Sequence, residues 1–135
     1  MDVNEMPLMR IDLIKGRRTP EQIKQVMQIA YDVTRDTFGV PEDDRFQVVT
    51  QHEPYEMCLL DAGLGIERTD DVILIQILST PRTTGQKKAY AKAAVEAFQR
   101  EMNLRPEDLM IVFANNHAED FSFGLGKHQF LDGEL

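Results

Sequence analysis

The residue types that most often perform chemistry in proteins are sparse in this sequence. Its histidines, His52, His117 and His128, and its single cysteine, Cys58, lie far apart and lack the short spacing typical of metal ligands. Neither His117 nor Cys58 has an evident partner for acid–base or nucleophilic work, so we interpret both as structural. The sequence therefore predicts no metal site, and one cysteine allows no internal disulfide.

A glycine turn that could cradle a phosphate is also missing. Gly63-Leu64-Gly65 lacks the third glycine and the helix start of a nucleotide-binding turn, so we expect no flavin, nucleotide or other cofactor. The formal charge of −8 argues against a nucleic-acid partner, because a phosphate backbone favours a basic surface. No apolar run is long enough for a bilayer, so no membrane association is predicted.

Length and the N-terminal composition narrow the class of protein further. A chain of 135 residues predicts a single domain, and its large exposed surface favours oligomerisation. The stretch MDVNEMPLMR lacks the basic and apolar pattern of a secretory signal. Together with the single cysteine, this favours a cytoplasmic location.

An internal repeat indicates the elements that must position any site. Residues 18–24 and 82–88 share four identities at an offset of 64, and Pro41-Glu42-Asp43 matches Pro106-Glu107-Asp108 at an offset of 65. In each half of the chain an apolar run precedes the first of these motifs, and another apolar run follows the Pro-Glu-Asp motif. We therefore interpret the chain as two strand–helix–strand units. The change of offset predicts a one-residue length difference in the helix-to-strand turn.

In the first unit, residues 9–14 alternate apolar and polar side chains as a half-buried strand does. Thr19 is expected to cap a helix, with Pro20 at its first position and Gln22 completing a capping box. Gly39 is expected to end that helix in the left-handed conformation, and residues 46–50 form the next strand.

In the second unit, residues 72–78 are nearly all apolar, which is typical of a central strand buried on both faces. Thr83 and Gln86 repeat the capping box, and residues 110–114 form the last long strand. The glycines and aromatic residues of the tail favour a C-terminal hairpin.

These units predict an α/β (α+β) fold with a four-stranded mixed sheet, two helices on one face and a C-terminal hairpin. The expected boundaries are an extension at 1–6, repeats at about 7–53 and 72–116, and the hairpin at 117–135. The second sheet face stays bare, so packing against other subunits is expected.

Motifs spread from Met6 to the end of the chain form a specific combination with these two units. They are Met6-Pro7-Leu8, Val40-Pro41-Glu42-Asp43-Asp44-Arg45, Gly63-Leu64-Gly65-Ile66, Pro81-Arg82-Thr83 and Phe121-Ser122-Phe123-Gly124. The combination resembles the tautomerase superfamily, of the 4-oxalocrotonate tautomerase and macrophage migration inhibitory factor type. Within it, the malonate semialdehyde decarboxylase branch is the most similar.

The resemblance implies a homotrimer whose catalytic group is the secondary amine of an N-terminal proline, which falls here on Pro7. In the decarboxylase branch an aspartate and two arginines assist, and the aspartate and one arginine fall on Asp44 and Arg82. The other arginine position is Thr80.

The pocket aromatics of the family correspond to Phe121 and Phe123. These two residues also have a structural interpretation, since they suit a hairpin or a subunit contact.

The implied chemistry depends on the pKa of the proline amine. An apolar pocket lowers that pKa, so the amine acts as a general base toward a carbon next to a carbonyl. Arg82 would bind the substrate carboxylate and stabilise enolate charge. If the amine stays protonated, it favours hydration or decarboxylation, with Asp44 maintaining the cation or activating water.

Thr80 is the first departure from the branch, because a single hydroxyl replaces a charged bidentate donor. Binding of malonate semialdehyde should weaken, so we predict a tautomerase, an isomerase that acts on a small 2-oxo or enol carboxylate. The alternatives are a decarboxylase or hydratase of that type, and a catalytically silent trimer with a blocked proline.

The second departure is the extension Met1-Asp2-Val3-Asn4-Glu5. If Met1 is the true start, the nitrogen of Pro7 is a tertiary amide without basicity. Either Met6 is the true start and its removal exposes Pro7, or the extension is kept and proline chemistry is lost or replaced.

The three catalytic candidates also have structural interpretations. Pro7 would merely start an edge strand. Arg82 would be a solvated residue beside a helix start, as Arg18 is at the matching place of the repeat. Asp44 would be a surface charge in an acidic turn.

Overall fold

The computed structural model describes residues 7–134. Four strands and two helices follow one another in the order β1 (Leu8–Ile14), α1 (Pro20–Phe38), β2 (Phe46–His52), β3 (Ile73–Ser79), α2 (Thr84–Met102) and β4 (Leu109–Asn115). Three short 3-10 turns lie at Pro54–Glu56, Pro106–Asp108 and Ala118–Asp120. The expected extension at 1–6 falls outside the described residues.

Both helices begin with the same local device, which confirms the prediction. The side chains of Thr19 and Thr83 each accept from the backbone N–H three residues on, and Gln22 and Gln86 each bond back to the cap residue. Each helix has 19 residues. Gly39 ends α1 with φ of 68°, the left-handed conformation that glycine adopts without steric cost.

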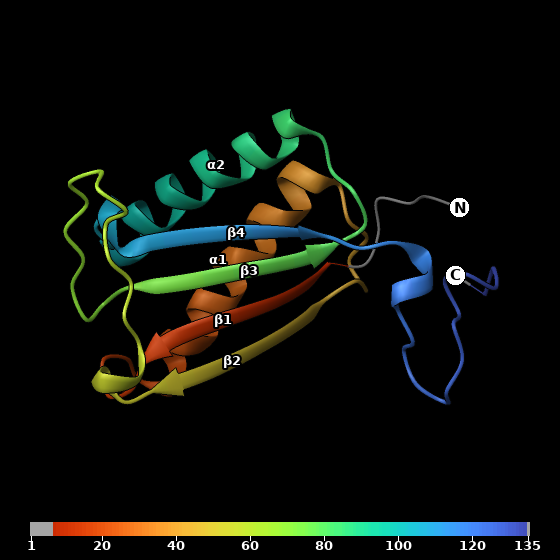
Figure 1. Ribbon diagram of the computed structural model, residues 1–135, viewed down its shortest axis with the longest axis horizontal. Coiled ribbons are helices and arrows are strands. Elements are labelled where there is room, and N and C mark those ends of the chain that lie inside the picture. Colours follow the sequence, from red (N-terminus) through yellow and green to blue (C-terminus); the bar gives the residue numbers. More distant parts are fainter. Residues whose placement is uncertain (1–6, 135) are drawn as a thin grey trace.

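The sheet has the strand order β2-β1-β3-β4 (Figure 1). Parallel pairs join β1 to β2 and β3 to β4, and an antiparallel pair joins β1 to β3 at the centre. In this view α1 lies behind the sheet and α2 lies above β4, and the two helices pack against each other and form one core with the same face of the sheet. The predicted mixed sheet with two helices on one face is therefore confirmed.

Strand β3 differs from the expectation of a strand buried on both faces. Its burial alternates, with Ile73, Ile75 and Ile77 fully buried under the helices and Leu74 and Leu78 only half-buried on the other face. The apolar run is continuous, yet one chain supplies helices for only one face.

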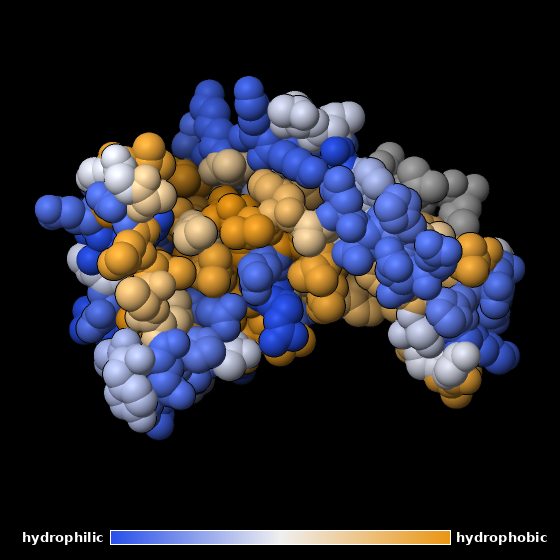
Figure 2. Space-filling view, in the orientation of Figure 1, coloured by the Kyte–Doolittle hydropathy of each residue, from blue (hydrophilic) through white to orange (hydrophobic). Residues whose placement is uncertain are grey.

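That second face carries an apolar surface, which Figure 2 shows between the 53–72 loop and the C-terminal segment. Val48 and Val112, on the two edge strands, are 45% and 40% exposed. Arg10 and Gln76 pair across the central strands and add a polar patch in the middle. A large exposed apolar face indicates an interaction surface.

The one-residue difference that the repeat predicted lies between the helix cap and the Pro-Glu-Asp triplet, since Val40 alone follows Gly39 there, whereas Leu104 and Arg105 follow Asn103. The complete connections differ in the opposite sense. Residues 39–45 join α1 to β2, and residues 103–108 join α2 to β4, so the first connection is one residue longer. In the second, Pro106–Asp108 leads directly into β4, whereas Asp44 and Arg45 separate the matching triplet from β2. The sequence places Asp44 where the two halves differ.

The C-terminal segment reverses its direction, but its arms form no strands within residues 117–134, so the predicted hairpin is corrected to a turn without a β-ladder. The side chain of Gln129 replaces the ladder. It accepts from the N–H of Phe123 at 3.1 Å and donates to the carbonyl of Gly124 at 2.8 Å. Phe130 is fully buried and anchors the segment.

Within residues 7–134, neither helix combines the length and apolar character that crossing a membrane demands.

Candidate active site

Strand directions bring the predicted site residues to one end of the sheet. Strands β1 and β2 begin at this end and β3 and β4 finish there, at the right in Figure 1. Pro7 immediately precedes β1, Asp44 lies two residues before β2, and Thr80 and Arg82 follow β3. Residues 36 or more positions apart in sequence therefore share one region.

Pro7 is buried and precedes a central strand, so the interpretation that it starts an edge strand is wrong. Its neighbour Leu8 pairs with Phe46 of β2 and with Leu78 of β3. Pro7 thus lies beside the residues that precede Phe46 and follow Leu78. Proline suits this place because a strand can begin without its missing N–H.

Arg82 is only 6% exposed, so the interpretation of a solvated arginine is wrong. Its Nη1 donates to the carbonyl of Thr80 at 2.8 Å and to the Thr80 hydroxyl at 3.0 Å. Its guanidinium carbon lies 4.9 Å from the ring centroid of Phe38, the last residue of α1. Burial, two acceptors and an aromatic face hold the cation in one orientation.

Thr80 is itself only 2% exposed. Its hydroxyl, which we expected to contact a substrate, accepts a hydrogen bond from Arg82. Thr80, Arg82 and Asp44 each make at least one further interaction. In this arrangement Thr80 positions the guanidinium of Arg82.

Asp44 is 7% exposed, so the interpretation of a surface charge is wrong. Its N–H donates to the carbonyl of Pro41 at 3.1 Å, which closes a turn. The Tyr31 hydroxyl donates to the carbonyl of Glu42 at 2.5 Å, and the Arg45 guanidinium lies 4.7 Å from the Tyr31 ring. Tyr31 of α1 thus fixes the loop that carries the aspartate.

Phe121 and Phe123 lie next to this end of the sheet. Their rings stack at 5.8 Å with an interplanar angle of 5°, and the ring of Phe123 lies 5.5 Å from that of Phe46. An apolar pocket of about 150 Å³ lies here, lined by Leu8, Phe46, Phe121, Ser122 and Phe123. Phe121 and Phe123, the predicted pocket aromatics, therefore line a pocket together with Leu8, the residue that follows Pro7.

Several residues at this end were missed by sequence reasoning. Phe46 and Leu8 are adjacent through the β1–β2 pairing, and Phe38 supports Arg82. Asn116 donates its backbone N–H to the carbonyl of Ser79 at 2.6 Å, and its buried Oδ1 accepts no hydrogen bond within residues 7–134. For Phe46 the sequence offered one signal, its place at the apolar start of the strand after Asp44. For Asn116 the sequence offered no signal.

The histidines and the cysteine lie apart from this cluster or on the surface. His52 pairs with Asp12 at 2.7 Å at the far end of β1, and Cys58 and His117 are exposed. Among the described residues, no three His, Cys, Asp or Glu side chains are grouped to hold a metal ion.

Known proteins match the chain along most of its length. Residues 44–124 match a family described as tautomerase enzyme, and residues 7–65 match a second family of the same description. A probable tautomerase of Bacillus subtilis, YrdN, is 35% identical over 96% of this chain and 100% of its own length. A second, YusQ, is 36% identical over 94% of this chain and 100% of its own.

The chain belongs to the tautomerase superfamily.

Within this superfamily it lies near the malonate semialdehyde decarboxylase branch. A solved structure of malonate semialdehyde decarboxylase has a TM-score of 0.89 and 41% identity, and covers 95% of this chain and 98% of its own. A second, inhibited by 3-bromopropiolate, has a TM-score of 0.87 and 32% identity, and covers 95% and 97%. A macrophage migration inhibitory factor-like protein of Entamoeba histolytica shares the fold alone, with a TM-score of 0.67 and 14% identity over 89% and 96% of the chains.

Proposed function

We propose that this tautomerase-superfamily protein is a keto–enol tautomerase that acts on a small 2-oxo or enol carboxylate. The observation that carries the proposal is the gathering of three buried groups, Pro7, Asp44 and Arg82, beside an aromatic pocket at one end of the sheet. Family membership and two relatives named probable tautomerases support the same class of reaction.

Arg82 binds the carboxylate in this proposal, because a guanidinium fixed by Thr80 and Phe38 offers N–H donors without having to reorient. The pocket lined by Phe46, Phe121 and Phe123 receives the apolar part of the substrate.

The secondary amine of Pro7 transfers the proton. In ketonisation the enol oxygen loses a proton and the neighbouring carbon gains one. A single group that alternates between amine and ammonium can therefore serve both steps. The proposal applies to a form in which Pro7 is the first residue, since an amide nitrogen is not basic.

Two influences oppose each other at that amine. Burial in apolar surroundings lowers the pKa of an amine, and a nearby carboxylate such as Asp44 raises it. A lowered pKa favours the general base that tautomerisation needs, whereas a raised pKa favours a cation that polarises a carbonyl.

We also propose that three copies assemble. The bare apolar face of the sheet supports this, since no element within residues 7–134 covers it. Fold neighbours at 16% identity include fused 4-OT proteins described as symmetric and asymmetric trimers.

Decarboxylation or hydration of a 3-oxo acid is the second candidate, favoured by the 41% identity to malonate semialdehyde decarboxylase. Thr80 argues against it, because the buried hydroxyl accepts from Arg82 and supplies no second positive charge. A Thr80→Arg variant should gain carbon dioxide release from malonate semialdehyde if the missing charge is the cause. Thr84→Arg adds the same charge at an exposed position nearby and serves as the control.

The deciding experiment follows the ketonisation of phenylenolpyruvate by ultraviolet absorbance. It compares the full chain, a form that begins at Pro7, and that form with Pro7→Ala. We expect activity in the Pro7 form and loss of at least about a hundredfold with Pro7→Ala, the range typical of a general acid–base group. Carbon dioxide release without ketonisation would favour the decarboxylase. Silence in all forms with intact trimers would favour a catalytically silent protein.

A further inference from the structure

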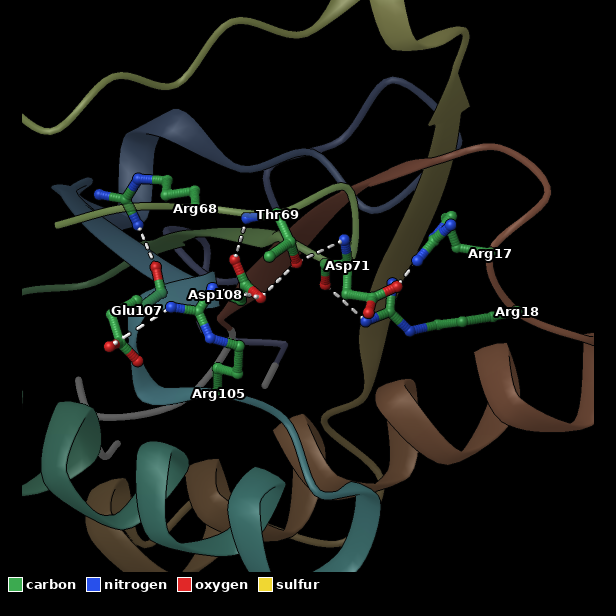
Figure 3. A network of polar contacts seen from close by, with 8 residues as sticks. All are labelled: Arg17, Arg18, Arg68, Thr69, Asp71, Arg105, Glu107 and Asp108. Atoms are coloured by element: carbon green, nitrogen blue, oxygen red, sulfur yellow. Dashed lines mark hydrogen bonds and ion pairs between the residues drawn. The ribbon is translucent and has the colours of Figure 1, made fainter.

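A second pocket, of about 200 Å³, lies at the opposite end of the sheet from Pro7, between the start of α1 and the end of α2. Its charged lining consists of Arg17, Arg18, Asp71, Arg105 and Asp108. Figure 3 shows these side chains in one network with Arg68 and Thr69 of the loop before β3 and with Glu107, whose carboxylate lies 3.5 Å from Nη2 of Arg105. Three guanidinium groups and two carboxylates leave the lining with a net positive charge.

The internal repeat relates this pocket to the candidate active site. Strands β1 and β3 are antiparallel, so equivalent residues of the two halves lie at opposite ends of the sheet. Arg18 precedes the cap of α1 as Arg82 precedes the cap of α2. Asp108 immediately precedes β4, whereas Asp44 lies two residues before β2 and follows Asp43, the residue that matches Asp108 in the repeat. Each end of the sheet therefore has an arginine before a helix cap and an aspartate before a strand.

One residue breaks the equivalence. Val72 immediately precedes β3, in the place that Pro7 has before β1, and it is buried. Val72 lies inside the chain and carries no amine, so this end has a cationic pocket without the amine that the candidate active site would use.

Both carboxylates of the pocket are already engaged by the protein. Asp71 accepts from Nε of Arg17 at 2.9 Å, and this hydrogen bond lowers the pKa of the Asp71 carboxyl. Asp108, 1% exposed, accepts from the backbone N–H of Thr69 at 2.7 Å and from its hydroxyl at 2.6 Å. Asp108 also lies 3.6 Å from Nη1 of Arg105. Neither carboxylate has its main contact with Arg18.

Arg18 is a cation that the nearby Asp71 and Asp108 compensate only in part. Its Nη2 donates to the carbonyl of Asp71 at 2.6 Å, whereas its Nη1 is buried and makes no hydrogen bond within residues 7–134. Burial lowers the pKa of the Arg18 guanidinium, and the charge of Arg17 acts in the same direction, while the charges of Asp71 and Asp108 oppose this shift. A buried donor left unsatisfied, next to an open pocket, favours an acceptor that brings negative charge.

We propose that this pocket binds a small monocarboxylate without converting it, with Arg18 as the main donor and Arg105 as the second. A pocket of about 200 Å³ is smaller than those that hold drug-sized ligands, which favours an anion of a few heavy atoms. The net charge of the lining favours one negative charge over two. This inference concerns a second site and does not depend on catalysis at Pro7.

The test titrates sodium pyruvate into the ¹⁵N-labelled full chain and follows backbone amide shifts by NMR. Saturable shifts are expected at Arg18, Asn103 and Arg105, in the wild type and equally in Arg82→Gln, which disables only the opposite end. Arg18→Gln should weaken the dissociation constant for these shifts by about tenfold or more, since it removes a charge-assisted donor. Arg100→Gln removes the same charge from the exposed surface of α2 and should leave binding unchanged.

Shifts confined to the Pro7 end, or shifts at Arg18 that vanish in Arg82→Gln, would overturn the proposal. Binding of inorganic phosphate without binding of pyruvate would overturn the carboxylate assignment. The Arg82→Gln arm leaves the second pocket intact, so the test holds even if Arg18→Gln fails to fold. Failure here leaves the ketonisation assay unaffected, and the two proposals are therefore tested separately.

Discussion

At the scale of single residues, Arg82 and Thr80 work as a pair. Arg82 donates to both the carbonyl and the hydroxyl of Thr80, and the ring of Phe38 lies against its guanidinium. A desolvated cation–π contact of this kind contributes roughly 1–2 kcal/mol. The cost of burying the cation is thereby offset by contacts that also fix its direction, which is what recognition of a carboxylate requires.

Thr80→Val tests this pairing, because it removes the hydroxyl acceptor while keeping nearly the same shape and the backbone carbonyl. In the form that begins at Pro7, we expect KM for phenylenolpyruvate to rise roughly three- to tenfold with a smaller change in kcat, consistent with the loss of one hydrogen bond to a charged group. Thr84→Val, at an exposed position, is the matched control. An unchanged KM in Thr80→Val would show that the carbonyl and Phe38 suffice.

At the scale of elements, the two helices begin and end in the same way, but the connections that follow them differ. Both start with a Thr–Gln capping box and both end in the left-handed conformation, at Gly39 and at Asn103. After Gly39 the chain makes the longer turn that carries Asp44, whereas after Asn103 it passes Asp108 and enters β4 directly. The connection after α1 thus places Asp44 at the Pro7 end of the sheet, and the connection after α2 places Asp108 at the Arg18 end.

Two glycine substitutions should change stability in opposite directions. Gly39→Ala should destabilise the fold by roughly 1–2 kcal/mol, because φ of 68° forces a Cβ into a left-handed conformation. Gly85→Ala, in the first turn of α2, should stabilise by roughly 0.5–1 kcal/mol, since alanine has the higher helix propensity and its Cβ would lie 3.8 Å from the Thr83 hydroxyl. Urea unfolding of both variants measures the difference, and the same sign for both would contradict the assignment.

The Arg17–Asp71 contact should appear in acid unfolding. The folded pKa of Asp71 is lowered by its hydrogen bond from Arg17, so its stabilising contribution is present above the ordinary carboxyl value of 3.8. That contribution is lost as the pH falls through the lower, folded pKa. Both side chains are 46% exposed, so we expect a small effect.

Unfolding curves of Asp71→Asn at neutral pH and near the ordinary pKa of a carboxyl group measure this contribution. The stability difference between the two conditions should be smaller than in the wild type. Asp70→Asn removes the neighbouring charge and provides the reference. A difference that stays at the wild-type size in Asp71→Asn would exclude the linkage.

At the scale of the whole molecule, the sheet separates two environments. One face is covered by α1 and α2 and forms the core, and the other presents half-buried and exposed apolar side chains (Figure 2). Both the Pro7 end and the Arg18 end border the same sheet. Any assembly on the bare face therefore lies close to both pockets.

Val112→Glu, on edge strand β4, should break the proposed trimer without unfolding the chain. Val112 is 40% exposed in the single chain, so a carboxylate there is solvated in the monomer and costly once a neighbour covers it. Sedimentation velocity should show monomers with unchanged circular dichroism. Lys92→Glu, on the exposed surface of α2, is the charge-change control and should leave the trimer intact. A Val112→Glu variant that remains trimeric would exclude this face as the interface.

The sequence by itself determined the elements and their ends. The two strand–helix–strand units, both capping boxes and the left-handed Gly39 were all predicted, because caps and hydrophobic periodicity depend on residues within a few positions of one another. The family resemblance named the site residues, while the residues themselves left Pro7, Asp44 and Arg82 open to structural interpretations.

Only the tertiary structure decided between those interpretations. Whether Asp44 and Arg82 are buried depends on strand order and on Tyr31 and Phe38, which local sequence does not report. The turn held by Gln129, the one-sided burial of β3 and the unsatisfied donor of Arg18 are likewise products of packing. Burial and hydrogen-bond satisfaction arise from contacts between distant parts of the chain, so they become visible only when the chain is folded.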